Sequence, residues 1–392
     1  MLVDLAARRR DFPALAGREI AYLDSAATTL RPQAVLDAVM RTFTHEAGNP
    51  HRSVHRFADA AADAIERARA SVARLLCGTP GEIIFTSGTT ASINLVAQAW
   101  GRANLGPGDV VIASELEHHS NLVPWQMICA ERGAELRIAP VDDAGRIELE
   151  RIDFARAKLV AVAHVSNVTG TIAPIAELAR RAHAVGALLL VDGAQAVAHL
   201  DVDVTALGCD FYAFSAHKVY GPTGTGVLWG RAAVLDAMPP WQGGGGMIRR
   251  VDATSSTYRE VPARFEAGTP NVAGIAGLDA ALAYMDTFAA RGDEARAHAA
   301  LIRAIRDAGG RVLGEPELAV VSFELPRVHP HDVATLADGD GVALRSGHHC
   351  AAPLHRRFGV EASTRASVGC YTNDGDIEMF RRTLARIREI FP

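Results

Sequence analysis

Two lysines, Lys158 and Lys218, are the only ones in a chain of 392 residues, although Lys and Arg together number 40. An amine can lose its proton and form an imine with a carbonyl compound, whereas a guanidinium group stays charged. A lysine that persists where arginine replaces nearly every other one is a candidate for chemistry that arginine cannot perform. Lys218 is that candidate, because it follows the apolar run Phe211–Phe214 and precedes a turn that begins at Gly221. A solvated lysine at the end of a strand is the competing interpretation.

Two further segments offer partners for the same chemistry. Asp192 directly follows four apolar residues, and a buried carboxylate is costly unless a cation faces it. A protonated pyridine nitrogen is such a cation, and its protonation makes the ring an electron sink. The segment Thr86–Thr90 lies between a strand and a helix and offers N–H and O–H donors to a phosphate. Singly, Asp192 is interpreted as a turn cap and Thr86–Thr90 as a helix N-cap. Together with Lys218 they indicate one site.

The elements that must position these residues alternate along the chain. Strands are predicted at Glu82–Thr86, Asp109–Ala113, Leu159–His164, Ala187–Asp192 and Phe211–Ser215, with helices between them at Ala91–Trp100, Asn121–Arg132 and Ile175–Val185. Strands separated by helices of this length predict βαβ units and a largely parallel sheet, hence an α/β fold. Ligands bind such sheets at the carboxyl ends of the strands, where Asp192 and Lys218 are expected to lie.

The remainder of the chain predicts a second, smaller unit. Gly243–Gly246 is interpreted as a loop, and an alanine-rich helix at about Ile275–Phe288 follows Pro270. Strand Leu318–Glu324 and helix Asp374–Ile390 then belong to a mixed pattern of helices and strands. We predict a large domain at residues 20–270 that binds a cofactor, and a small α+β domain made of residues 1–19 and 271–392.

Composition narrows the classes of partner and compartment. The net charge of −5 and pI of about 6.3 predict no attraction to nucleic acid or to acidic membranes. Neither a secretory leader nor an apolar run of about 20 residues is present in the sequence, which favours a location in the cytoplasm. The cysteines, at positions 77, 129, 209, 350 and 370, form no CxxC pair, so neither a metal site nor a disulfide framework is expected.

Seven blocks in order carry a resemblance to a known family. They are Tyr22–Ala27, Glu117–Trp125, Ser166–Thr171, Asp192–Gln195, Ser215–Lys218, Glu266–Asn271 and Arg345–Cys350. The chain resembles the group II cysteine desulfurases and the related selenocysteine lyases, within the class V aminotransferase superfamily of fold-type-I pyridoxal 5′-phosphate (PLP) enzymes. The resemblance implies a large, mostly parallel sheet of seven strands and a smaller domain that carries Cys350. Ala216 and Ser87 depart from it, since the family often has Gly and Arg there.

The resemblance also implies a role for individual residues. Lys218 would hold PLP as an imine and move the Cα proton of the substrate. Asp192 would contact the pyridine nitrogen, Gln195 the ring hydroxyl, and His118 would stack on the ring and act in proton transfer. The phosphate would be held by Thr89, Ser215 and His217, and the substrate would be bound by Asn167, Arg365 and Arg345. Thr269 would reach the phosphate of a neighbouring subunit. That reach implies a homodimer with active sites at its interface.

Cys350 is the predicted sulfur acceptor. It follows a segment rich in arginine and histidine, and nearby cations favour the thiolate, which is the nucleophile. The resemblance implies that Cys350 takes sulfur from L-cysteine as a persulfide and leaves L-alanine. Because the following segment, Ala351–Leu354, is short and apolar, we expect an acceptor protein that comes to the site. The other cysteines are interpreted as structural, with Cys77, Cys129 and Cys209 expected to be buried.

Other functions remain as alternatives at this point. Selenocysteine lyase, class V aminotransferase and kynureninase reactions use the same scaffold, and transamination needs no cysteine. A non-catalytic scaffold for iron–sulfur cluster assembly is the alternative from another class, but it has no need of Lys218. The identity of the sulfur acceptor, the preference between L-cysteine and L-selenocysteine, and the pathway served, whether iron–sulfur cluster synthesis or another sulfur cofactor, stay open.

Overall fold

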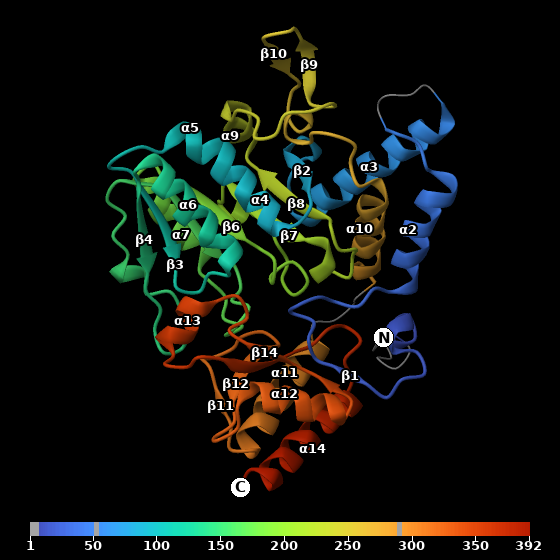
Figure 1. The fold of residues 1–392 in the computed structure, drawn as a ribbon, viewed down its shortest axis with the longest axis vertical. Coiled ribbons are helices and arrows are strands. Elements are labelled where there is room, and N and C mark those ends of the chain that lie inside the picture. Colours follow the sequence, from blue (N-terminus) through green and yellow to red (C-terminus); the bar gives the residue numbers. More distant parts are fainter. Residues whose placement is uncertain (1–7, 51–54, 288–291) are drawn as a thin grey trace.

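The computed structural model describes residues 8–50, 55–287 and 292–392 and shows two lobes, one above the other in Figure 1. The upper lobe contains a seven-stranded sheet in the order β2-β8-β7-β6-β5-β3-β4. Its strands are β2 (Ile83–Thr86), β3 (Val110–Ser114), β4 (Glu135–Ala139), β5 (Ala157–Ala163), β6 (Leu188–Asp192), β7 (Phe211–Ser215) and β8 (Gly226–Gly230). Strand β8 runs antiparallel to both neighbours, and the other pairings in this sheet are parallel. The predicted α/β fold with a mostly parallel sheet is confirmed.

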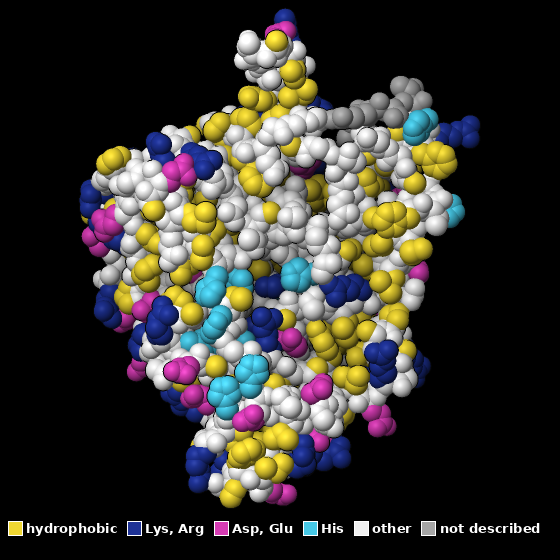
Figure 2. Space-filling model, in the orientation of Figure 1, with side chains coloured by type: hydrophobic (Ala, Val, Ile, Leu, Met, Phe, Trp, Pro, Cys, Tyr) yellow, Lys and Arg dark blue, Asp and Glu magenta, His cyan; other side chains and the backbone are white. Residues whose placement is uncertain are grey.

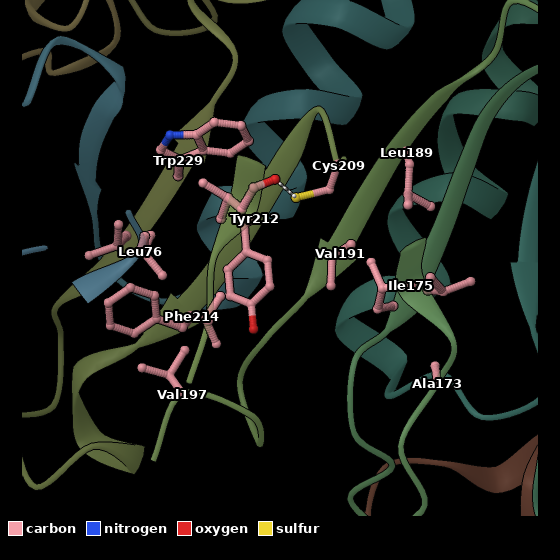
Figure 3. Packing of buried hydrophobic residues seen from close by; sticks show 14 of the residues in the cluster. Leu76, Ala173, Ile175, Leu189, Val191, Val197, Cys209, Tyr212, Phe214 and Trp229 are labelled. Carbon is pink, nitrogen blue, oxygen red and sulfur yellow. Dashed lines mark hydrogen bonds between the residues drawn. The ribbon is translucent and has the colours of Figure 1, made fainter. Parts of the chain in front are cut away.

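Alternating residues of the central strands bury their side chains in two different cores. Val160 and Val191 belong to one buried cluster, whereas Leu159 and Leu190 belong to a second. This division follows from the pleat of a strand, which points successive side chains to opposite faces. Figure 3 shows part of the first cluster, in which Tyr212 and Phe214 of β7 pack near Val191. A sheet buried on both faces explains why its strands are continuously apolar in sequence.

Helices pack around this sheet. They are α4 (Thr89–Val96), α5 (Arg102–Asn104), α6 (Val123–Arg132), α7 (Ile175–Ala184), α8 (Val204–Leu207) and α9 (Ala232–Ala237), with α2 (Gln33–His45), α3 (Arg56–Leu75) and α10 (Val272–Met285) packed together at the right of Figure 1. A π-helical turn at Ala97–Gly101 joins α4 to α5. The helix predicted at Ala91–Trp100 is therefore interrupted. The end of the helix predicted at Ile275–Phe288 lies outside the described residues.

The lower lobe is built on a four-stranded antiparallel sheet. Its order is β11 (Arg311–Val312), β12 (Val320–Glu324), β15 (Ser363–Ser367), β14 (Arg345–Gly347). Helices α11 (Gly292–Asp307) and α12 (Pro330–Gly339) pack on it, and α14 (Asp374–Ile390) packs on these two helices. Strand β1 (Ala21–Tyr22) pairs with β13 (Val342–Ala343) of this lobe, whereas α10 packs on α2 and α3. The division at residues 20 and 270 remains a proposal, and this packing favours moving Ala21–Tyr22 to the small domain and α10 to the large one.

A hairpin that was not predicted projects from the upper lobe. Strands β9 (Ile248–Val251) and β10 (Ser256–Tyr258) pair with each other beyond the Gly243–Gly246 loop, and the hairpin stands clear of the rest of the lobe in Figure 1. Its residues are mostly exposed, so no alternation of apolar and polar side chains marks it in the sequence. Across the described ranges, no helix combines the length and apolar character needed to cross a membrane.

Candidate active site

A cavity of about 190 Å³ opens at the carboxyl edge of the large sheet. It is lined by ten of the residues predicted from sequence: Thr89, His118, Asn167, Asp192, Gln195, Ser215, His217, Lys218, Arg345 and Arg365. The parallel strands β5, β6 and β7 all end at this edge, which brings together residues that lie far apart in the chain. The small lobe contributes Arg345 from β14 and Arg365 from β15.

Lys218 and Asp192 form the charged centre of the cavity. Lys218 ends a single turn of 3₁₀-helix, Ala216–Lys218, directly after β7. Burial lowers the pKa of Lys218 to about 8, and the Arg365 and Arg345 charges act in the same direction, whereas Asp192 opposes them. Burial raises the pKa of Asp192, and the charge of Lys218 opposes that shift. An amine that is partly neutral near physiological pH can form an imine, which suits the predicted role of Lys218.

The turn after Asp192 is held tightly over the sheet. Asp192 Oδ1 accepts a hydrogen bond from Ala194 N at 2.9 Å. A side chain at Gly193 would meet the Tyr212 ring at 2.1 Å, so the backbone can pass this close only with glycine there. Gln195 Nε2 donates to the carbonyl of Ala26 at 2.8 Å, which leaves its second N–H for a ligand. The Asp192 carboxylate is thus fixed in position by its own strand and turn.

A cluster of donors marks the end of the cavity predicted to hold a phosphate. Thr89 is the first residue of α4, and Ser215 Oγ accepts from its backbone N–H at 2.8 Å and lies 2.7 Å from its Oγ1. The first N–H groups of a helix lack partners within it and attract anions. A Cβ at Gly226 would lie 2.3 Å from Gly88 Cα, so β8 packs directly under this turn. Burial lowers the pKa of His217, beside this cluster, to about 4, so its ring is neutral at pH 7.

His118 is a neutral imidazole with a defined tautomer. The Ser120 backbone N–H donates to His118 Nδ1 at 3.1 Å, so this nitrogen carries the lone pair and the proton sits on Nε2. Burial lowers the pKa of His118 to about 3. The preceding residue, Glu117, is buried and accepts from Ala163 N at 3.1 Å and Asn121 Nδ2 at 2.6 Å. These bonds anchor the turn that presents His118 to the end of β5.

Arg365 is a buried residue of the small sheet and lines the cavity. Its Nη2 pairs with Asp24 Oδ1 at 3.1 Å, and its Nη1 donates to the Asn167 carbonyl at 3.0 Å. Its Nε is buried and has no hydrogen-bond partner among the described residues. Arg345 lies directly opposite Arg365 in the β14–β15 register. Two guanidinium groups at one end of a small cavity suit a carboxylate ligand.

Cys350 stands beside the cavity on a strained, anchored segment. The φ angles of His349 and Cys350 are 49° and 57°, a left-handed conformation that costs about 1–2 kcal/mol per non-glycine residue. The Cys350 carbonyl accepts from His119 N at 2.7 Å, and His119 Nε2 accepts from Ala352 N at 3.2 Å. Asn167 Nδ2 donates to the His349 carbonyl at 2.7 Å. The segment is thus held to the large lobe on both sides of the sulfur, and Asn167 serves this segment as well as the cavity.

The charge around Cys350 differs from the sequence interpretation. Figure 2 shows histidine side chains, in cyan, gathered on one face at the height where the two lobes meet. Burial strongly lowers the pKa of His349, and burial and His348 lower that of His119. His349 and His119 are therefore neutral at physiological pH. The positive charges that interact with the Cys350 thiolate are those of Arg365 and Lys218.

The remaining predicted residues lie apart from the cavity. Thr269 is exposed and lines a separate cavity of about 320 Å³, so its role toward a neighbouring subunit stays a prediction. Cys129, Cys209 and Cys370 are buried, and burial raises the pKa of each thiol. Cys77 was expected to be buried and is exposed, because it lies in the left-handed turn that follows α3.

Sequence reasoning assigned no role to several residues that shape the site. His349 and Ser120 line the cavity, and Glu117 anchors the turn that carries His118. All three lie within blocks that carry the family resemblance, beside residues that did receive a role. Their signal in the sequence is this adjacency, but what each one contacts depends on strands and helices distant in the chain.

The residues around the cavity fit PLP. The buried carboxylate of Asp192 suits a pyridinium nitrogen, and the amine of Lys218 suits an imine. The turn at Thr89 and Ser215 offers donors to a phosphate, and the neutral His118 ring lies on the same cavity wall as Ser120 and Thr90. These groups together match the pyridine ring, the aldehyde and the phosphate of the cofactor.

Comparisons with known proteins agree on one family. The family model described as aminotransferase class-V matches residues 21–380. A cysteine desulfurase of Dickeya dadantii (strain 3937) is 46% identical, over 97% of this chain and 96% of that protein. A cysteine desulfurase of Klebsiella pneumoniae (strain 342) is 45% identical, over 97% of this chain and 98% of that protein. The crystal structure of the cysteine desulfurase CsdA (S-sulfonic acid) from Escherichia coli superimposes with a TM-score of 0.92 at 39% identity and covers 100% of both chains.

Proposed function

The chain belongs to the class V aminotransferase family, and from this premise we propose that it is a PLP-dependent cysteine desulfurase that converts L-cysteine to L-alanine and carries the sulfur on Cys350. The observation that carries the proposal is the placement of four side chains at one cavity. Lys218, Asp192 and Arg365 line it, and Cys350 interacts electrostatically with both Lys218 and Arg365. Transamination would leave the anchored Cys350 segment without a purpose.

The residues of the chain divide the work of binding. Arg365 and Arg345 hold the carboxylate of L-cysteine at the small-lobe side of the cavity. PLP would be held by Asp192, Gln195, Thr89, Ser215 and His217, and Lys218 would bind it covalently through its amine. When bound, PLP withdraws electrons from the amino acid and so weakens its bonds at Cα and Cβ. His118 lines the same cavity, so its neutral ring would contact the bound cofactor and its Nε2–H would be the proton donor.

The proton and sulfur steps use Lys218 and Cys350. Once the amino group of the substrate has replaced it on PLP, the free Lys218 amine would take the Cα proton of the substrate and later return a proton. Cys350 attacks the substrate sulfur as a thiolate, so an S–S bond forms while the Cβ–S bond breaks. The electron pair of the broken bond ends as a C–H bond of L-alanine. Cys350 is left as a persulfide, so the products of one turnover are L-alanine and one persulfide.

Partners and location follow from the same features. Thr269 is exposed and does not line the candidate active-site cavity of its own chain. This position supports a homodimer in which Thr269 reaches the phosphate bound by the neighbouring subunit. The anchored Cys350 segment supports delivery to an acceptor protein that docks at this face. The persulfide would then supply iron–sulfur cluster or other sulfur-cofactor synthesis in the cytoplasm. L-selenocysteine fits the same cavity as an alternative substrate.

One assay tests the proposal against its alternatives. Purified protein loaded with PLP is mixed with L-cysteine and dithiothreitol, and sulfide and alanine are quantified for wild type, Cys350→Ala and the matched control Cys129→Ala. Equal amounts of sulfide and alanine from wild type and control, with neither above background from Cys350→Ala, support the proposal. Full turnover in Cys350→Ala would overturn the role of Cys350. No alanine from wild type would overturn desulfuration, and L-selenocysteine and amino-group acceptors would then identify the reaction.

A further inference from the structure

Two buried polar atoms at the cavity have no hydrogen-bond partner within the described residues. They are His349 Nδ1 and Arg365 Nε, and both residues line the cavity. Their side chains are almost fully buried, at 3% and 2% exposure. Leaving a buried polar atom unpaired costs free energy, and such atoms in native proteins mark a ligand or a functional constraint. Arg365 Nε–H is a donor, so the character of His349 Nδ1 decides what ligand the pair fits.

A chain of three hydrogen bonds defines that character. His355 Nδ1 lies 3.1 Å from the Ala351 carbonyl, which can only accept, so this nitrogen carries a proton. Burial lowers the pKa of His355, so the ring is neutral and its Nε2 accepts from Ser363 Oγ at 2.9 Å. The Ser363 hydroxyl has then used its proton and accepts from His349 Nε2 at 3.1 Å. His349 therefore keeps its proton on Nε2 and presents a lone pair at Nδ1.

The surroundings of this lone pair limit its partner to a neutral donor. A carboxylate is excluded because it is itself an acceptor, and it suits the guanidinium groups of Arg365 and Arg345 instead. An ammonium group is disfavoured beside the same two cations. The thiol of L-cysteine is a neutral S–H donor, separated from its carboxylate by two carbons. One free donor and one free acceptor at the cavity thus match the two ends of this amino acid.

We propose that His349 Nδ1 accepts a hydrogen bond from the thiol of bound L-cysteine and so holds the substrate sulfur next to Cys350, with Ser363 and His355 as positioning residues that define the tautomer. The inference rests on the proposed function and names a substrate contact within it. L-alanine has no thiol and loses this contact. The cavity therefore distinguishes substrate from product by a single hydrogen bond, which favours release of the product.

Equilibrium binding separates this inference from the proposed function. In PLP-loaded Cys350→Ala protein, which cannot remove sulfur, binding of L-cysteine and of L-alanine is followed by cofactor absorbance. His349→Leu is expected to weaken L-cysteine binding about 2- to 10-fold, as for one hydrogen bond, and to leave L-alanine binding within about twofold. Ser363→Ala is expected to give a smaller loss in the same direction. His331→Leu, an exposed histidine outside the cavity, is the matched control and should change neither ligand.

Equal weakening of both ligands by His349→Leu would overturn the inference and leave the proposed function intact. Binding of neither ligand to the parent protein would overturn both. A second measurement depends on neither ligand nor cofactor: ¹⁵N NMR of histidine-labelled wild type should find His349 protonated on Nε2 and His355 on Nδ1. Protonation of His349 on Nδ1 would overturn the inference. Loss of this pattern in Ser363→Ala, with His331 unchanged, would support the role of Ser363.

Discussion

The cofactor-free protein should contain one lysine that titrates far below the usual range. Burial lowers the pKa of Lys218 from 10.5 to about 8, a difference worth about 3 kcal/mol in favour of the neutral amine. At pH 7 roughly one Lys218 side chain in ten is then neutral, about 300-fold more than for an ordinary lysine. We expect this fraction to set the rate at which Lys218 captures an aldehyde, because only the neutral amine adds to a carbonyl.

The two-lysine composition makes this titration direct to measure. In protein labelled with ¹³C at lysine Cε, only Lys158 and Lys218 give signals, and Lys158 is half exposed at the amino end of β5, the opposite edge of the sheet. The Lys218 signal should titrate near pH 8. Asp192→Asn should lower that midpoint, because Asp192 favours the charged amine, and Arg365→Gln should raise it. A midpoint at or above pH 10, or a rise in Asp192→Asn, would refute the reasoning.

The same shift predicts how stability depends on pH. Because the pKa of Lys218 is lower in the folded state, the unfolded state binds more protons between pH 8 and 10.5, and the free energy of unfolding rises with pH across this window. The contribution of Lys218 is a penalty of about 3 kcal/mol below pH 8 that vanishes above pH 10.5. Lys218→Met, compared within an Asp192→Asn background to remove the coupling between the two groups, should stabilise cofactor-free protein at pH 7 and lose that advantage by pH 10.5. An advantage equal at both pH values would contradict this origin.

Two further pairs of substitutions test contacts outside the cavity. Arg69 is buried and donates to both carboxylate oxygens of Glu266 at 3.0 Å. Arg69→Met should therefore lower the free energy of unfolding, measured with denaturant, by about 3 kcal/mol, and adding Glu266→Gln should restore part of it. A loss under about 1 kcal/mol would show that the pair is not effectively buried. His119→Leu removes the acceptor of the Ala352 N–H and should lower kcat for desulfuration about tenfold at unchanged KM. His119→Gln should restore the rate, because its amide oxygen can accept the same N–H. Equal rates in both variants would rule out this positioning role.

Local pattern and sheet geometry together were sufficient to predict the core of the fold. The apolar runs that became β6 and β7 predicted strands that end at Asp192 and Ser215, and parallel strands share one carboxyl edge. Asp192 pairs with Ala213 in the register, so Lys218, one turn beyond β7, necessarily lies nearby. The prediction succeeded here because each step depended on residues close in sequence.

Other features depend on contacts that no local pattern encodes. The left-handed backbone at Cys350 is held by Asn167 and His119, which come from different loops of the large lobe. The lone pair on His349 depends on a hydrogen-bond chain through Ser363 that exists only once β15 is in place. Protonation states follow the same rule, because burial lowers the pKa of His349 and makes neutral a ring that the sequence suggested was basic.

The placement of the two lysines on opposite edges of one sheet has a consequence for the protein as a target of chemical damage. Sugars, aldehydes and other carbonyl compounds in a cell react indiscriminately with lysine amines, and most proteins offer them many. Here the other strongly basic side chains are guanidinium groups, and of the two lysines only Lys218 is enclosed in a cavity shaped for one particular aldehyde. Its walls then act as a filter in front of the reactive amine. Glycation and adventitious cross-linking would have few places to begin, while Lys218, the amine that we propose to react with a carbonyl, remains available to it.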